Sequence, residues 1–183
     1  MKKNEAPVWD WPVRLLHWSL VLTVVSAWVL GGSSGRRGEW HEWLGYAAGV
    51  VVALRVALGI RGQGYARFGQ FVRSPRATLA YAGQVVRGTA PRYLGHNPLG
   101  GWMVLLLLGC VAALVLSGWL YTTDWLWGFE WLYLLHFVLG WLLVALVALH
   151  LAGVFITGRK HGDTLVRAMF TGRKAPAQGD DIA

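Results

Sequence analysis

Four long runs of apolar residues constrain the fold of this chain more than any other feature. They cover about 13–30, 43–60, 100–119 and 131–157, and each approaches the ~20 residues that a helix needs to cross a bilayer. Trp and Tyr side chains crowd the ends of the runs, where amphipathic rings favour the headgroup level. With 55% hydrophobic and 14% charged residues, the chain is too apolar for a soluble domain of its size. The sequence therefore predicts an all-α integral membrane four-helix bundle in contact with lipid.

We expect one membrane domain over residues 1–174 and a flexible C-terminal tail over 175–183, because the tail is polar and lacks apolar periodicity. Two lysines precede the first run, as in a secretion signal. However, Arg14 and His17 interrupt the run and no convincing small-residue cleavage site follows it. We therefore interpret the first run as a retained helix.

The connection between the second and third runs contains a further helix signal. Ser74 followed by Pro75 is typical of a helix cap and first turn, and Gly88 marks a stop. The pattern predicts a short helix that lies on the membrane surface.

The distribution of positive charge predicts the topology. The segment 61–98 contains six arginines and no acidic residue, and the segment after the fourth run is also basic. The connection between the third and fourth runs contains Asp124 and Glu130 but no Lys or Arg. Because Lys and Arg favour the cytoplasmic side, both termini and the long loop are expected in the cytoplasm. The net charge of +8 reflects this topology, so we expect no nucleic-acid partner.

Four histidines fall at two depths in the predicted bundle. His136 and His150 are fourteen residues apart, so they share a helix face and lie roughly 21 Å apart along its axis. With the predicted topology, His41 and His136 share the outer level, and His17 and His150 share the inner level. Ionisable residues at membrane depth usually serve a function. Alternatively, each histidine is a polar residue that bonds a neighbouring helix.

Two imidazoles per level suit haem iron, because the porphyrin supplies the other four ligands. A zinc site needs four protein ligands, and neither level clearly offers them. The single Cys110 excludes a C-x-x-C-H haem attachment. Each pair therefore predicts one non-covalent haem b, with Gly45 and Gly140, one turn from a histidine, giving clearance for the macrocycle. Both glycines could instead be packing notches between helices.

Other polar residues suggest contacts with haem or quinone. Arg55 lies fourteen residues after His41, on the same face and near the inner level, where a haem propionate needs a cation. It could equally snorkel to the interface. Arg14 is a weaker candidate for the same contact. His96 and Asn97 precede the third run, where they either form a helix cap and turn or line a quinone site near the inner haem.

The chain resembles the bacterial di-haem cytochrome b family, which includes bacterial cytochrome b561 and the b-type subunits of nickel–iron hydrogenases. The resemblance covers nearly the whole chain. The residues that show the resemblance are the segments Val8–Trp18, His41–Gly45, Gly95–Trp102 and Leu165–Lys174, together with the pair His136 and His150.

The resemblance implies two haems ligated by His17, His41, His136 and His150, quinone exchange near the inner haem, and electron transfer with a periplasmic redox partner. Small c-type cytochromes and hydrogenase-like enzymes are the candidate partners. Two other functions remain open: a self-sufficient quinol oxidase that reduces oxygen, and a proton or metal-ion conduit without haem. The lack of carboxylates inside the runs disfavours the conduit.

Overall fold

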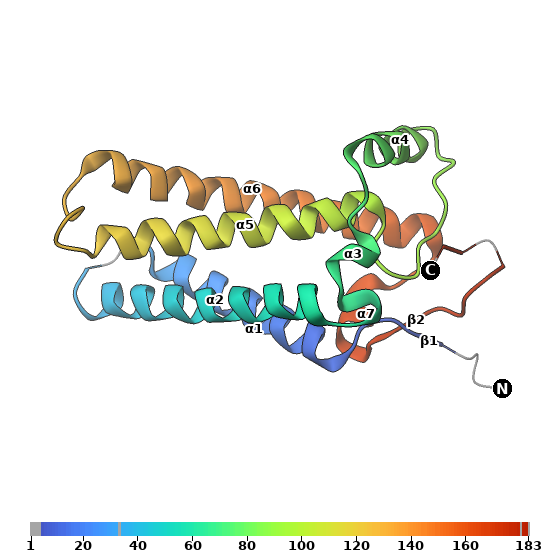
Figure 1. Cartoon of the computed structure of the whole chain (residues 1–183), viewed down its shortest axis with the longest axis horizontal. Coiled ribbons are helices and arrows are strands. Elements are labelled where there is room, and N and C mark those ends of the chain that lie inside the picture. Colours follow the sequence, from blue (N-terminus) through green and yellow to red (C-terminus); the bar gives the residue numbers. More distant parts are fainter. Residues whose placement is uncertain (1–4, 33, 180, 183) are drawn as a thin grey trace. The chain divides into compact units, whose positions relative to one another are not determined.

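The computed structural model describes residues 5–32, 34–179 and 181–182. Four long helices dominate it: α1 (Trp11–Leu30), α2 (Arg36–Arg61), α5 (Pro98–Tyr121) and α6 (Glu130–His161) (Figure 1). Their most apolar stretches have mean hydropathies of 1.7, 1.8, 2.5 and 2.4, and each helix is long enough to cross a membrane. Most apolar side chains of these helices are exposed, as expected for side chains that contact lipid. The predicted all-α membrane bundle is confirmed.

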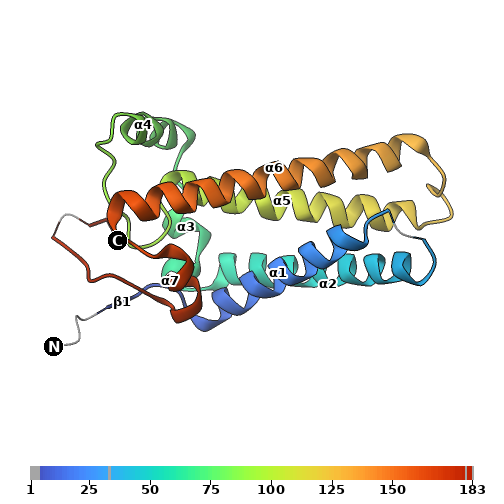
Figure 2. The same ribbon diagram turned by 180° about the vertical axis from the view of Figure 1, so that it is seen from behind.

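The remaining elements are short. They are β1 (Ala6–Pro7), the 3-10 helix η1 (Gly64–Ala66), α3 (Phe68–Phe71), α4 (Pro75–Val86), α7 (Leu165–Thr171) and β2 (Arg173–Lys174). The two strands pair antiparallel, with Ala6 opposite Lys174. Strand β1 leads into α1, as Figure 2 shows.

All four long helices extend beyond the predicted runs, and two of them do so by four residues or more at one end. Helix α2 begins at Arg36, seven residues before the predicted start, and α6 continues to His161. An apolar run marks only the part of a helix that lies in the hydrocarbon layer. The backbone hydrogen bonds of the helix continue through polar residues at the interface. Helix α6 is followed by Gly162 at a φ of 65°, a left-handed conformation that glycine adopts without strain.

The predicted short helix in the long loop is present as α4. Ser74 caps it, because its Oγ accepts a hydrogen bond of 3.3 Å from the backbone N–H of Ala77, and Pro75 occupies the first turn. Its position on a membrane surface stays a prediction.

The chain divides into two compact units. Unit 1 comprises the residues up to Arg14, Ala57–Leu105 and the residues from Leu149 onward, and unit 2 comprises Leu15–Val56 and Leu106–Ala148. Unit 2 contains segments of all four long helices. Its helices contact one another closely: the Trp28 and Trp141 rings are 5.2 Å apart, and a Cβ on Gly49 would lie 2.9 Å from Val115.

Unit 1 is held together by buried ionic contacts around Arg92. The guanidinium donates two hydrogen bonds of 3.0 Å to the Asp163 carboxylate and one of 2.5 Å to Asp181 in the tail. The backbone N–H of Ile182 donates to the Arg92 carbonyl over 3.0 Å. The flexible tail was predicted from composition alone. Composition cannot reveal contacts between the tail and a loop that is distant in sequence.

Candidate functional site

The structure brings together two of the four predicted histidines. His41, in the second turn of α2, and His136, in the second turn of α6, both belong to unit 2. Their ring centres are 6.0 Å apart and the ring planes are inclined by 78°. Both side chains are half-buried. Two imidazoles from different helices therefore face one another across a short gap.

Hydrogen bonds hold the Nδ1 side of both rings. Nδ1 of His41 lies 2.8 Å from the carbonyl oxygen of Ala27 on α1. Nδ1 of His136 lies 3.0 Å from Oγ of Ser117 on α5. An imidazole that donates from one nitrogen keeps the other available to a metal, and such partners fix the ring orientation. In both histidines Nε2 is the nitrogen left for a ligand.

Sequence reasoning missed both partners. Ser117 carried a usable signal, since it is the only serine or threonine within α5 and a buried hydroxyl at membrane depth needs a partner. The Ala27 carbonyl carried none, because any helical residue offers the same backbone group.

The separation of the rings fits a metal held between them. Metal–imidazole nitrogen bonds are about 2 Å long, so a metal between two imidazoles holds their ring centres roughly 6 Å apart, and the observed separation is 6.0 Å. Among the described residues, no group of three or more His, Cys, Asp or Glu could hold a metal ion. A macrocycle that brings four ligands of its own needs only these two imidazoles.

The glycines near the site differ in their surroundings. A Cβ on Gly118 would lie 3.1 Å from Cε1 of His136, so this glycine, which sequence reasoning missed, leaves space for the imidazole. A Cβ on Gly45 would meet nothing within 4 Å, whereas one on Gly140 would lie 3.3 Å from the Trp28 ring. Gly140 thus has a helix-packing contact, and haem clearance at either predicted position stays a prediction.

The inner pair is divided between the units. His17 belongs to unit 2, where its ring centre lies 5.2 Å from that of Trp18, and His150 belongs to unit 1. Both side chains are half-buried. Their pairing stays a prediction.

The two predicted propionate cations have different environments. Arg55, in unit 2, is 7% exposed although it is charged and lies in a candidate membrane span. Arg14, in unit 1, donates a hydrogen bond from its guanidinium to the carbonyl oxygen of Phe170 in α7. Arg14 therefore links the start of α1 to α7, a structural role that its position in the sequence did not predict.

Asn97 and His96 have structural contacts in unit 1. The backbone N–H of Gly100 donates to Oδ1 of Asn97 over 2.7 Å, which confirms the predicted cap of α5. The His96 ring packs between two aromatic rings, with centre distances of 4.6 Å to Trp9 and 4.4 Å to Phe71. A contact with quinone at this turn stays a prediction.

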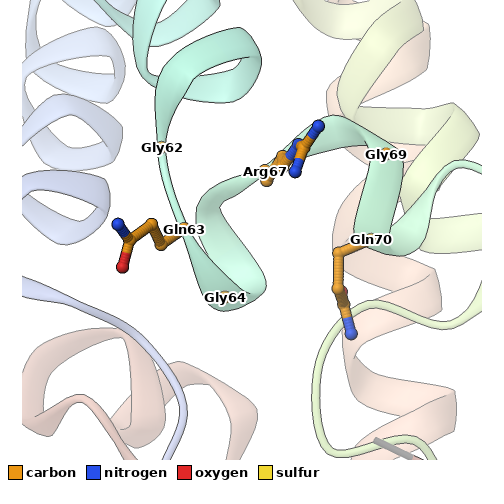
Figure 3. A pocket seen from close by; sticks show the side chains of 6 residues that line it. All are labelled: Gly62, Gln63, Gly64, Arg67, Gly69 and Gln70. Atoms are coloured by element: carbon orange, nitrogen blue, oxygen red, sulfur yellow. The ribbon is translucent and has the colours of Figure 1, made fainter.

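A pocket in unit 1 was not predicted from the sequence. It encloses about 480 Å³ at the end of α2 and is lined by Gly62, Gln63, Gly64, Arg67, Gly69 and Gln70 (Figure 3). It gathers none of the residues that the sequence analysis singled out.

Four membrane-spanning helices and a facing pair of imidazoles define a membrane protein suited to hold a planar metal macrocycle. A model of the prokaryotic cytochrome b561 family matches residues 8–172, and the chain belongs to this family. It is therefore a bacterial membrane b-type cytochrome that binds haem and takes part in electron transfer. No curated protein and no solved structure matches the chain.

Proposed function

We propose that the chain carries two haems b and transfers electrons between the quinone pool and a periplasmic redox partner. His41 and His136 ligate the outer haem, and His17 and His150 ligate the inner one. The observation that carries the proposal is the 6.0 Å separation of the His41 and His136 rings, which belong to different helices and have both Nδ1 atoms engaged.

Bis-histidine ligation suits electron transfer more than oxygen activation. Haem would supply a one-electron iron couple, and the two imidazoles of each proposed pair would hold the iron and complete its ligand set. The chain's own contribution is to hold both imidazoles in fixed orientations and to surround them with apolar side chains. This supports an electron-transfer subunit over an oxidase.

We further propose that Arg55 pairs with a propionate of the inner haem. A guanidinium that is 7% exposed in an apolar span can form a strong charge-assisted hydrogen bond to a carboxylate group. Arg14 is the second candidate, although its bond to Phe170 already uses part of its guanidinium.

The quinone site is proposed on the cytoplasmic side, at the turn formed by His96 and Asn97. Half-buried polar side chains beside aromatic rings suit a quinone headgroup, which has two carbonyl acceptors and a flat ring. The basic long loop and C-terminal segment support a cytoplasmic position for this turn in the bacterial inner membrane.

The outer connections between the helices, residues 31–35 and 122–129, are too short to house a further redox centre. Electrons that reach the outer haem therefore pass to, or come from, another protein. A c-type cytochrome or a hydrogenase-like enzyme has the required chemistry.

Haem stoichiometry tests the proposal. A pyridine-haemochrome assay on the purified chain should give two haems b per polypeptide, both low-spin and both extracted by acid acetone. One haem per chain, or haem that resists extraction, would contradict the proposal.

The quinone site needs variants that respect the contacts of the turn. His96→Phe keeps an aromatic ring between Trp9 and Phe71 but removes both ring nitrogens, and it should slow haem reduction by a quinol analogue. Asn97→Asp retains the oxygen that caps α5 while removing the amide N–H₂. Unchanged reduction rates in both variants would place the quinone elsewhere.

A further inference from the structure

Ser117 is a buried hydroxyl at the outer histidine pair. It is 3% exposed, lies on α5, which supplies none of the four proposed ligands, and its Oγ is 3.0 Å from Nδ1 of His136. The other ring of the pair is held differently, since Nδ1 of His41 contacts the backbone carbonyl of Ala27 at 2.8 Å. A substitution can remove the hydroxyl, but it cannot remove the carbonyl.

The surroundings of Ser117 assign the direction of its bond to His136. Oγ lies 3.1 Å from the carbonyl oxygen of Leu114, which can only accept. A serine has one hydroxyl hydrogen. Because that hydrogen is donated to Leu114, the Ser117 oxygen accepts the N–H of His136 Nδ1.

We propose that Ser117 is a positioning residue for the outer haem, which fixes the tautomer and orientation of His136 and sets the electron donation of this axial ligand. The inference rests on the proposed ligation by His136. A hydrogen-bond acceptor at the distal nitrogen makes an imidazole more basic, and partners of this kind orient the ligand and tune the metal. A more basic ligand favours ferric iron, so Ser117 lowers the reduction potential of the outer haem and strengthens its binding.

The neighbouring residue supports this role. A Cβ on Gly118 would lie 3.5 Å from Nδ1 of His136 and 3.1 Å from Cε1. Ser117 thus places a hydroxyl beside Nδ1 of His136, and the missing side chain of Gly118 leaves room for the neighbouring Cε1. A hydroxyl side chain inside a membrane helix can be satisfied by its own helix, as Thr23 is by the carbonyl oxygen of Ser19 at 2.9 Å. Ser117 differs because it also contacts a residue of another helix.

Redox titration of the purified, haem-loaded protein tests the proposal. Ser117→Ala should shift the midpoint potential of one haem in the positive direction and leave the other unchanged. It should also accelerate the transfer of one haem to an apoprotein acceptor about 10-fold to 100-fold, the usual effect of losing such a partner. Ser117→Thr keeps a hydroxyl and should restore both properties.

Two further variants make the outcome decisive. Thr23→Val removes a hydroxyl that, among the described residues, bonds Ser19 and Leu20 of its own helix, and it should change neither potential nor the transfer rate. His136→Ala should abolish the outer haem. If His136→Ala retains both haems, the proposed ligation fails. If His136→Ala loses one haem while Ser117→Ala matches Thr23→Val, or Ser117→Thr behaves as Ser117→Ala, the role of Ser117 is refuted and the ligation stands.

Discussion

Nδ1 of His41 on α2 lies 2.8 Å from the carbonyl oxygen of Ala27 on α1. This contact joins the helices on either side of the first connection and fixes the orientation of the His41 ring. The equivalent contact of His136 goes to Ser117 on α5. Four helices thus contribute to the surroundings of the His41–His136 pair, although only two of them carry the histidines.

If the four histidines form two pairs, the effects of substitution should group by membrane level and not by helix. His41→Ala and His136→Ala should remove or perturb one spectral component, and His17→Ala and His150→Ala the other. A double substitution within one pair should do little more damage than a single one, since both act on one shared site. Low-temperature difference spectra of the α-band would measure this. Identical spectra for the His136 and His150 variants would show that the depth assignment is wrong.

Gly118→Ala should perturb the outer haem selectively. The new methyl group would lie 3.1 Å from Cε1 of His136, so the ring must move by a few tenths of an ångström or rotate. Gly109→Ala, on the same helix, is the matched control because its Cβ would meet nothing within 4 Å. Electron paramagnetic resonance of the ferric protein should show altered g-values for one haem in Gly118→Ala and none in Gly109→Ala.

Gly45→Ala tests whether haem fills the space beside this glycine. In the protein alone a methyl group here meets nothing within 4 Å, and alanine favours helix more than glycine by about 1 kcal/mol. A purely structural glycine would therefore tolerate the change or gain thermal stability. We expect reduced haem content at the outer site instead, measured by haemochrome assay. Full haem content with raised stability would assign Gly45 no role in haem clearance.

Lys174 should make the stability of the protein depend on pH in the alkaline range. Its Nζ donates to the carbonyl oxygens of Tyr93 and Gly95 at 3.3 and 3.4 Å, and burial lowers its pKa from the ordinary 10.5 to about 8. Between these values the unfolded chain binds the proton more tightly, so the free energy of unfolding rises with pH, by about 1.4 kcal/mol per pH unit at most. Tyr81, whose pKa burial raises from 10.0 to about 12, opposes this rise at the top of the window, because the tyrosine of the unfolded chain ionises there while the folded one stays neutral.

Thermal unfolding in detergent between pH 8 and 10 would measure the effect. Lys174→Met should flatten the rise, because no group titrates at that position. Lys160→Met is the control, since Lys160 is exposed at the end of α6 and its replacement should leave the profile unchanged. A Lys174→Met profile that parallels the wild type would refute the assignment.

The membrane class and the four helices were predictable because the bilayer imposes a length and an apolarity on each span, and both can be read locally. The cap of α4 by Ser74 and that of α5 by Asn97 were also predictable, since a cap is a contact within three residues. Helix ends were less predictable. Helix α2 begins at Arg36 because a helix does not stop where the apolar run stops.

The sequence by itself determined that His41 and His136 belong to one membrane level, because helical periodicity and charge asymmetry place each residue in depth. Only the tertiary structure decided that their rings stand 6.0 Å apart, that Ala27 and Ser117 hold them, and that Gly118 faces His136. Depth is a one-dimensional property, set residue by residue by the transfer of side chains from water to lipid. The rotation of each helix about its axis is decided by packing between segments distant in sequence, and a single chain read alone contains no local signal for it.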